Sequence, residues 1–353
     1  MPARNDFSRV RQSLLLQGKP DRVPLWELEI DREVKQAFLG REIAVPADEA
    51  GGIADEVAFW VQAGYDYVPL SVGLLHVAEV LSGEAARLSR DSYSVYSAER
   101  EVKWAAEGEG VLTSWEQFEA FPWPDPDDID LSHLHAVARL LPENMRIIAI
   151  VGKIFTATWM LMGFEGFGYA CAYQPDLVAA VFRRIGEIQY RVCQRCLETP
   201  GVAALWMSDD IAYGQGMMVS PKLLREHLFP WYARLGAELN AAGIPFIFHS
   251  DGDLWPVMDD ILACGFNAIH PIEPKAMDSR EVKARYGDRL CLTGNIELDR
   301  LSRGTPEEIR EMVRRNVSEL GNDGGYCVGS SNSVTYYVPL ENYLAMIEAA
   351  LEG

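Results

Sequence analysis

A histidine and two carboxylates follow a short apolar run in the second half of the chain. The segment FIFHSDGDLWPVMDDI, residues 246–261, places His249, Asp251 and Asp253 directly after three apolar residues. Imidazole nitrogen and carboxylate oxygen bind zinc and move protons in enzymes. A buried strand gains nothing from such side chains. The segment therefore predicts a site for a substrate or a metal ion.

Other apolar runs also end in polar side chains. In chain order these are Glu27, Glu29, Ser71, Lys153, Asp209, Asp210, His249, Asp251, Glu273, Asn295, Ser331 and Asn332. Any one of them can be a solvated strand end, and Asp209 or Asp210 can simply bind loop amides. Their occurrence after nearly every run favours one shared site. We take His249, Asp251, Asp210 and Glu273 as candidate catalytic residues.

Eight apolar runs alternate with long amphipathic stretches. The runs are residues 22–27, 65–71, 146–152, 202–210, 244–251, 268–273, 289–295 and 325–331. Strands of this kind, alternating with helices, form a parallel sheet covered on both faces. Eight such units predict a closed (β/α)8 TIM barrel, in which strand-end residues meet at the carboxyl-end mouth. An open doubly wound sheet is the alternative, but no glycine-rich dinucleotide loop follows an early strand.

One segment interrupts the alternation. Residues 92–115 carry apolar positions such as Val102 and Trp104, and Gly108 and Gly110 indicate a turn before VLTSW. This pattern predicts a β-hairpin inserted near the barrel mouth, followed by the proline-rich loop FPWPDPDD. We expect one domain over residues 1–353, with an insertion at about 92–128.

Composition limits the partners. The chain has 353 residues, of which 48% are hydrophobic, and a formal net charge of −20. This charge repels nucleic acid and anionic membrane surfaces. No apolar run is long enough to span a membrane, and the first residues lack an apolar signal core. We expect a soluble cytoplasmic protein that binds neither nucleic acid nor membrane.

The six cysteines are scattered along the chain. A chain of this size needs no disulfides. Cys193 and Cys196 form a C-x-x-C pair within a helical pattern, but no second pair follows. Buried packing is therefore favoured over a zinc site.

Several ordered segments resemble the uroporphyrinogen decarboxylase superfamily, which includes cobalamin-dependent methyltransferases. They are RVRQSLLLQGKPDRVPLWE, DDIAYGQGMMVSPKLLREHLFPWYARL, FHSDGDLWPVMDDILACGFNAIHPIEP, MDSREVKARYGDRLCLTGNIE and the stretch from GTPEEIREMVRRNVSELG to VPLENYLAMIEAA. The resemblance covers nearly the whole chain and implies a (β/α)8 barrel. It implies either cofactor-independent decarboxylation or methyl transfer involving a corrinoid on a separate protein, usually with zinc. Decarboxylases of this family are dimers, so a homodimer is also implied.

The opening motif distinguishes these two activities. In the decarboxylases that the chain resembles, the opening segment is rich in arginine and binds the carboxylates of the porphyrinogen. Here the matching segment, VPLWELEIDREV, presents Glu27, Glu29 and Asp31, with Arg32 as its one cation. These carboxylates would repel an anionic tetrapyrrole. The thiol methyltransferases of the superfamily bind zinc through a His-x-Cys pair and a later cysteine. This chain has Asp251 at the first cysteine position and Ser330, Ser331 and Asn332 around the later one.

In place of the cysteine ligands, the chain offers nitrogen and oxygen ligands: His249 and Asp251, with Asp210 or Glu273. We expect zinc on His249, Asp251 and Glu273, acting as a Lewis acid on the oxygen of a methyl ether. Without metal, His249 would be a general acid oriented by Asp251 or Glu273. The expected function is methyl transfer from a small donor to the corrinoid of a partner protein; a methoxylated aromatic compound is one candidate donor, and other methyl donors stay open. The alternatives are a decarboxylase acting on a small substrate through Lys153 or Arg32, and a binding module without catalysis. The expected substrate-binding residues are Glu27, Glu29, Trp206, Asn295, Asn332 and Tyr337.

Overall fold

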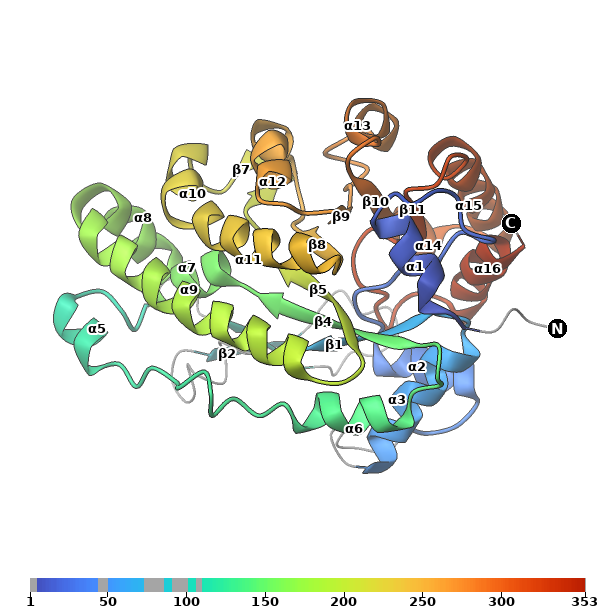
Figure 1. Cartoon of the computed structure of the whole chain (residues 1–353), viewed down its shortest axis with the longest axis horizontal. Helices are drawn as coiled ribbons and strands as arrows, with labels where there is room; N and C mark the ends of the chain where they lie inside the picture. The colour runs from blue at the N-terminus through green and yellow to red at the C-terminus, as the bar shows by residue number, and fades with distance from the viewer. Residues whose placement is uncertain (1–4, 44–49, 73–85, 91–100, 106–109, 353) are drawn as a thin grey trace.

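The computed structural model describes residues 5–43, 50–72, 86–90, 101–105 and 110–352. Seven strands form one curled parallel sheet in the order β1-β4-β5-β8-β9-β10-β11 (Figure 1). Their bounds are β1 Tyr67–Ser71, β4 Arg146–Gly152, β5 Val202–Ser208, β8 Phe246–His249, β9 Ala268–His270, β10 Cys291–Ile296 and β11 Tyr326–Ser330. Each strand falls on one of the predicted apolar runs, and β10 extends one residue beyond its run, to Ile296. The predicted (β/α)8 barrel is confirmed.

The first predicted run closes the barrel without forming a regular strand. Leu25 makes a parallel bridge to Val328 in β11, and the Trp26 amide donates to the Val328 carbonyl at 2.6 Å. On the other side, the Tyr67 hydroxyl lies 2.9 Å from both the backbone nitrogen and the carbonyl oxygen of Glu27. Pro24 interrupts this run, and proline has no N–H to donate to a ladder. A side chain therefore joins the first run to β1.

Helices cover the outside of the sheet. They are α1 Phe7–Leu14, α2 Arg32–Leu39, α3 Ala50–Gln62, α5 Trp115–Ala120, α6 Ser132–Leu140, α7 Ile154–Met162, α8 Phe164–Tyr173, α9 Pro175–Glu198, α10 Pro221–His227, α11 Phe229–Ala242, α12 Met258–Ala263, α13 Ser279–Tyr286, α14 Leu298–Arg303, α15 Pro306–Leu320 and α16 Leu340–Leu351, with the 3₁₀ turn η2 Trp255–Val257. Thr305 and Glu308 form a capping box at the start of α15, and Pro175 occupies the first turn of α9. These residues fix the starts of the helices that precede β5 and β11 in the chain.

The inserted hairpin lies earlier than predicted. β2 (Ala86–Arg90) pairs antiparallel with β3 (Glu101–Ala105). The second arm lies inside the predicted segment 92–115, whereas the first arm precedes it. Gly108 is not among the described residues, so the turn predicted at Gly108 and Gly110 stays a prediction. The predicted insertion limits include residues 91–100 and 106–109, which lie outside the described residues. β6 (Ala212–Tyr213) and β7 (Gly216–Met217) form a second small hairpin after β5.

Aromatic rings fill the barrel interior below its mouth. The ring centroid of Trp26 lies 4.6 Å from that of Trp206 and 5.1 Å from that of Tyr67. All three side chains are fully buried. Among the described residues, no helix is both long and apolar enough to cross a membrane.

Candidate active site

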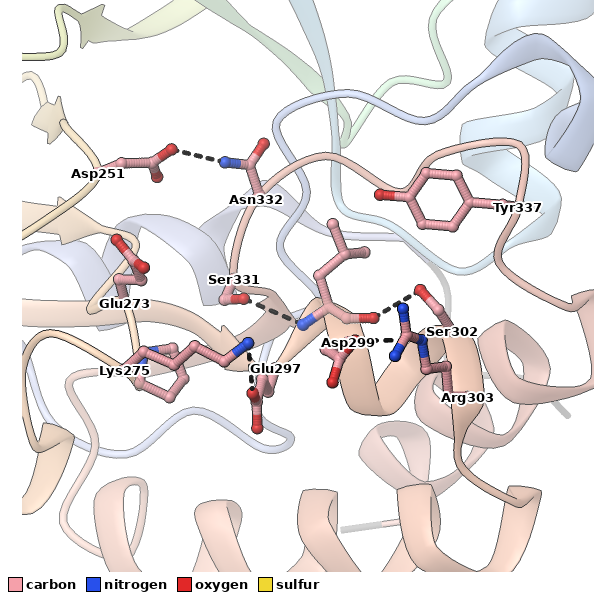
Figure 2. A pocket seen from close by; sticks show the side chains of 12 residues that line it. Asp251, Glu273, Lys275, Glu297, Asp299, Ser302, Arg303, Ser331, Asn332 and Tyr337 are labelled. Carbon is pink, nitrogen blue, oxygen red and sulfur yellow. Dashed lines mark hydrogen bonds and ion pairs between the residues drawn. The ribbon is translucent and has the colours of Figure 1, made fainter. Parts of the chain in front are cut away.

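A cavity of about 640 Å³ lies where four neighbouring strands end (Figure 2). Its walls come from the segments that follow β8, β9, β10 and β11. The lining residues are Asp251, Glu273, Pro274, Lys275, Glu297, Leu298, Asp299, Ser302, Arg303, Ser331, Asn332 and Tyr337. The carboxyl ends of barrel strands are where enzymes of this architecture hold their active sites. The polar strand ends seen in the sequence therefore share one cavity.

Charge in the cavity is unevenly balanced. Lys275 pairs with Glu297 at 3.4 Å, and Arg303 pairs with Asp299 at 3.3 Å. Neither Asp251 nor Glu273 makes an ion pair with a lysine or arginine of the described chain. The unpaired charges of the cavity are thus carboxylates.

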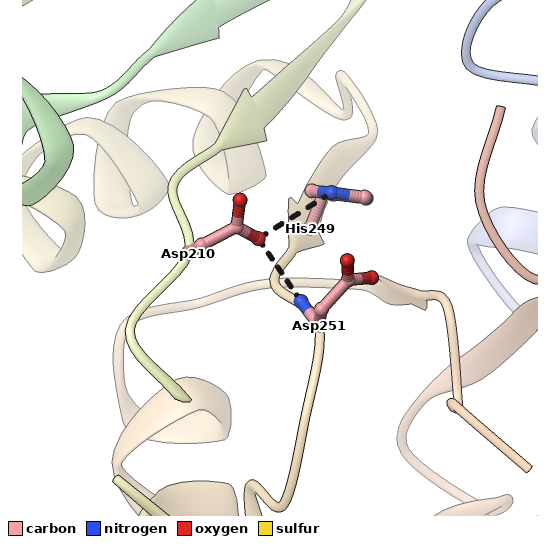
Figure 3. Close-up of side chains that lie close together, drawn as sticks. All are labelled: Asp210, His249 and Asp251. Atoms are coloured by element: carbon pink, nitrogen blue, oxygen red, sulfur yellow. Dashed lines mark hydrogen bonds and ion pairs between the residues drawn. The ribbon is translucent and has the colours of Figure 1, made fainter. Parts of the chain in front are cut away.

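Asp210, His249 and Asp251 converge beside this cavity (Figure 3). Asp210 follows β5, and His249 ends β8, where it is paired in register with Ser208 of β5. The Asp251 amide donates to Asp210 Oδ1 at 3.0 Å, and His249 Nε2 lies 3.6 Å from the same oxygen. One ligand atom from each residue lies within 4.8 Å of the others. This spacing suits a bound cation.

Asp251 connects this cluster to the cavity. Its Oδ2 accepts a hydrogen bond from Asn332 at 2.8 Å, while its Oδ1 is buried with no partner among the described residues. Burial, together with repulsion from Asp210 and Glu273, raises the pKa of Asp251 to about 7. A carboxyl group with this pKa is half protonated near neutral pH, so it can deliver a proton.

His249 is paired with a second histidine that the sequence analysis missed. The Nδ1 atoms of His249 and His270 lie 2.7 Å apart, and the two rings stack with centroids 5.0 Å apart. Burial lowers the pKa of His249, Asp210 raises it and Lys153 lowers it further. Burial also lowers the pKa of His270, and His249 adds to this effect. Both rings are therefore held in the neutral form.

The family model described as uroporphyrinogen decarboxylase (URO-D) matches residues 107–352. The chain belongs to the uroporphyrinogen decarboxylase family. It is 24% identical over 290 residues to the uroporphyrinogen decarboxylase of Psychromonas ingrahamii, which covers 76% of this chain and 78% of that protein. It is 26% identical over 252 residues to that of Methylococcus capsulatus, covering 65% and 66%.

A solved structure of a methyltransferase from Methanosarcina mazei has the same fold. It covers 98% of both chains, with a TM-score of 0.75 and 17% sequence identity. The family match therefore concerns proteins described as decarboxylases, while the likeness to the methyltransferase structure shows a shared fold. The choice between the two reactions depends on the site residues.

Two predicted carboxylates of the opening segment lie away from the cavity. Glu27 is fully buried, and its carboxyl group accepts from the amide and hydroxyl of Ser330 at 2.8 and 2.6 Å. Burial raises the pKa of Glu27 to about 8, although the Ser330 bonds oppose this. Glu27 thus joins the first run to β11 and is not placed to contact a substrate. Glu29 is exposed, and its carbonyl accepts from Val334; its side chain is not part of the cavity lining.

Trp206 and Asn295 support the site from within the barrel wall. Trp206 presents its ring to the His270 ring at 4.9 Å, nearly perpendicular, so it packs beneath the histidine pair and does not line the cavity. Asn295 has φ +81° and donates to the Ile272 carbonyl at 3.0 Å, which holds the segment between β9 and Glu273. Asn332 and Tyr337 line the cavity, as expected for substrate-binding residues.

Glu273 lies next to the cluster, outside the set of three converging residues. Its Oε2 accepts from the Gly252 amide at 2.9 Å, which orients the carboxylate toward the loop after β8. Asp209, the neighbour of Asp210, has a different role. It accepts from the amides of Phe155 and Thr156 and from the Tyr232 hydroxyl. Asp209 therefore caps the start of α7.

All six cysteines are free. Cys193 and Cys196 are buried in α9, which agrees with a packing role.

Proposed function

We propose that this protein is a methyltransferase that moves a methyl group from a small donor, such as a methoxylated aromatic compound, to the corrinoid cobalt of a partner protein. One observation carries the proposal: the Asp210, His249 and Asp251 cluster opens, through Asp251, onto a cavity whose unpaired charges are carboxylates. Such a cavity favours neutral donors over polyanionic ones. The cluster supplies groups that act on a leaving oxygen.

The three converging residues fit a zinc ion. One imidazole nitrogen and two carboxylates are ordinary zinc ligands, and Asp251 Oδ1 is buried without a hydrogen-bond partner among the described residues. Zinc held there would act as a Lewis acid on the ether oxygen of the donor. Asp210 belongs to this set, while Glu273 is a neighbour whose charge acts on Asp251.

The residues of the chain handle the leaving group. The partner's corrinoid would supply the electron pair for the new bond to the methyl carbon, and the donor oxygen would keep the pair of the broken carbon–oxygen bond. That oxygen then needs a proton, since an alkoxide or phenolate leaves poorly. Without zinc, Asp251, with its pKa of about 7, is the donor best placed to supply it; with zinc on the ionised Asp251, the ion would stabilise the oxygen instead. Asn332 fixes the orientation of the Asp251 carboxyl group, and Tyr337 and Leu298 offer contact area for an aromatic ring.

A decarboxylase acting on a small substrate is the alternative. Lys153 favours it, because this cation lies close enough to lower the pKa of His249. A decarboxylase must hold a substrate carboxylate, which needs a cation that is not already neutralised. Lys275 and Arg303 are both paired with carboxylates. Arg32 is on α2, bound to Gln36 and close to Glu42. Lys153 does not line the cavity, so methyl transfer agrees better with the charges of the cavity.

Three further expectations belong to this proposal. The corrinoid would be delivered by a protein partner, because the cavity of about 640 Å³ holds a small donor and not a corrinoid as well. A homodimer follows from the likeness to the decarboxylases. A cytoplasmic location agrees with six free cysteines, which persist in reducing compartments.

A spectroscopic assay tests the proposal. Cob(I)alamin is mixed with the purified protein and a panel of methoxylated aromatic compounds, with and without zinc, and methylcobalamin is followed by its absorbance. We expect formation that is lost in His249→Ala and retained in His135→Ala, whose histidine is exposed on α6. Equal activity in both variants would contradict the assignment of the site.

A further inference from the structure

The buried pair of His249 and His270 fixes a proton position. Their Nδ1 atoms are 2.7 Å apart, so one must donate and the other must accept. If His270 donates, the remaining proton of His249 is on Nε2. If His249 donates, its Nε2 keeps a free lone pair. We infer that His270 is a positioning residue that accepts the Nδ1 proton of His249 and thereby leaves the Nε2 lone pair facing Asp210 and Asp251.

The far side of the His270 ring favours this arrangement. When His270 accepts at Nδ1, its own proton is on Nε2, which is buried. The Ser330 carbonyl oxygen and His270 Nε2 border the same small space, since a Cβ built on Gly294 would lie 2.7 Å from the first and 3.2 Å from the second. In the opposite tautomer a buried lone pair would face this carbonyl, an arrangement that costs free energy.

No comparable interaction on the His249 side favours the opposite tautomer, in which Nε2 of His249 carries the proton. Asp210 Oδ1, the acceptor nearest to His249 Nε2, is 3.6 Å away and already accepts from the Asp251 amide at 3.0 Å. A separation of 3.6 Å is too long for a hydrogen bond. A proton on His249 Nε2 would therefore gain little, whereas a lone pair there can bind a cation between the two carboxylates.

The surroundings hold His270 rigidly. It is 0% exposed, sits opposite His249 in the β8–β9 register and packs edge-on against Trp206 at 4.9 Å. Gly294 makes room for it, because a Cβ on Gly294 would stand 3.2 Å from His270 Nε2 and 2.7 Å from the Ser330 carbonyl oxygen. A metal-binding imidazole is commonly oriented by an acceptor for the N–H of its other ring nitrogen. This inference rests on the proposed function, in which His249 is a site residue. It concerns only which ring nitrogen of His249 carries the proton.

Long-range ¹H–¹⁵N NMR of the full-length protein tests it without donor, corrinoid or metal. The His249 signals are assigned from the spectrum of His249→Ala. We expect wild-type His249 to carry its proton on Nδ1. His270→Gln, which retains an oxygen acceptor, should preserve this tautomer, and His270→Phe, which has no acceptor, should shift it toward Nε2–H.

Cobalt(II) titration gives a second readout. We expect its affinity to fall about 10- to 100-fold in His270→Phe and to be largely restored in His270→Gln. An Nε2–H tautomer in the wild-type spectrum would overturn the inference, even if His270→Phe failed to fold. An unchanged Nδ1–H tautomer in a folded His270→Phe would overturn it too. Failure of methyl transfer would leave the NMR result untouched, so the two proposals are tested separately.

Discussion

Replacing Glu27 with glutamine should change how the stability of the protein depends on pH. Burial raises the pKa of Glu27 from 4.5 to about 8 in the folded state. The folded state therefore holds a proton that the unfolded chain has lost between pH 4.5 and 8. The contribution of the protonated Glu27 to stability is fully present below pH 4.5 and is lost as the pH rises from there through 8.

The size of the effect follows from the pKa difference. One pKa unit corresponds to about 1.4 kcal/mol, so Glu27 should lower the free energy of unfolding by about 3 kcal/mol between pH 5 and pH 8. Glutamine reproduces the protonated side chain. Its oxygen can accept from the Ser330 amide, and its NH₂ group can donate to the Ser330 hydroxyl, which in turn donates to the Asn332 carbonyl. Glu27→Gln should thus match wild type at pH 5 and exceed it at pH 8.

Urea unfolding at pH 5, 6, 7 and 8 measures this difference. Glu29→Gln is the matched control, because Glu29 lies two residues away with an exposed side chain. We expect the control to follow the wild-type curve. If the Glu27→Gln variant also followed the wild-type curve, the Glu27 carboxyl group would be ionised in the folded state. An ionised carboxylate between the first run and β11 would need a buried cation, which the described residues do not show.

The remaining predictions concern the strand ends. Asp209→Ala should lower the free energy of unfolding by about 3 kcal/mol or more, since it leaves buried donors of α7 unpaired. Asp210→Ala, with a side chain 51% exposed, should change stability by less than about 0.5 kcal/mol while weakening cobalt(II) binding about tenfold or more. Gly294→Ala should cost about 1–3 kcal/mol, because φ is +87° there. Urea unfolding and calorimetric titration check these values, and equal stability losses for Asp209→Ala and Asp210→Ala would contradict the assignment of separate roles.

The barrel could be predicted from the sequence because periodicity reports burial. Each near-continuous apolar run became a strand or, at Leu25, a bridge. The Thr305 cap and Pro175 marked helix starts by local chemistry alone. Pro24 was the sign that the first run would not form a full ladder.

The site was only partly predictable. His249 and Asp251 are close in sequence, but His270 joins them through the pairing of β8 with β9, which a single sequence does not display. A signal was present, since the run AIHPIE contains a histidine at its third position. Asp209 and Asp210 point to opposite sides, as successive residues of an extended chain do, so composition alone could not assign their roles. Glu27 follows an apolar run like the others, yet the closure of the barrel buries it against Ser330.

The most direct test of the central claim follows the carbon that the protein transfers. The protein, cob(I)alamin and zinc are incubated with methoxylated aromatic compounds labelled with ¹³C in the methoxy group, and with methoxybenzoates labelled in both the methoxy and the carboxyl group. Carbon NMR then reports the products. We predict that the methoxy carbon appears on cobalt and that this signal is lost in His249→Ala. Release of labelled carbon dioxide, with no methyl carbon on cobalt, would contradict the account and assign the protein to decarboxylation.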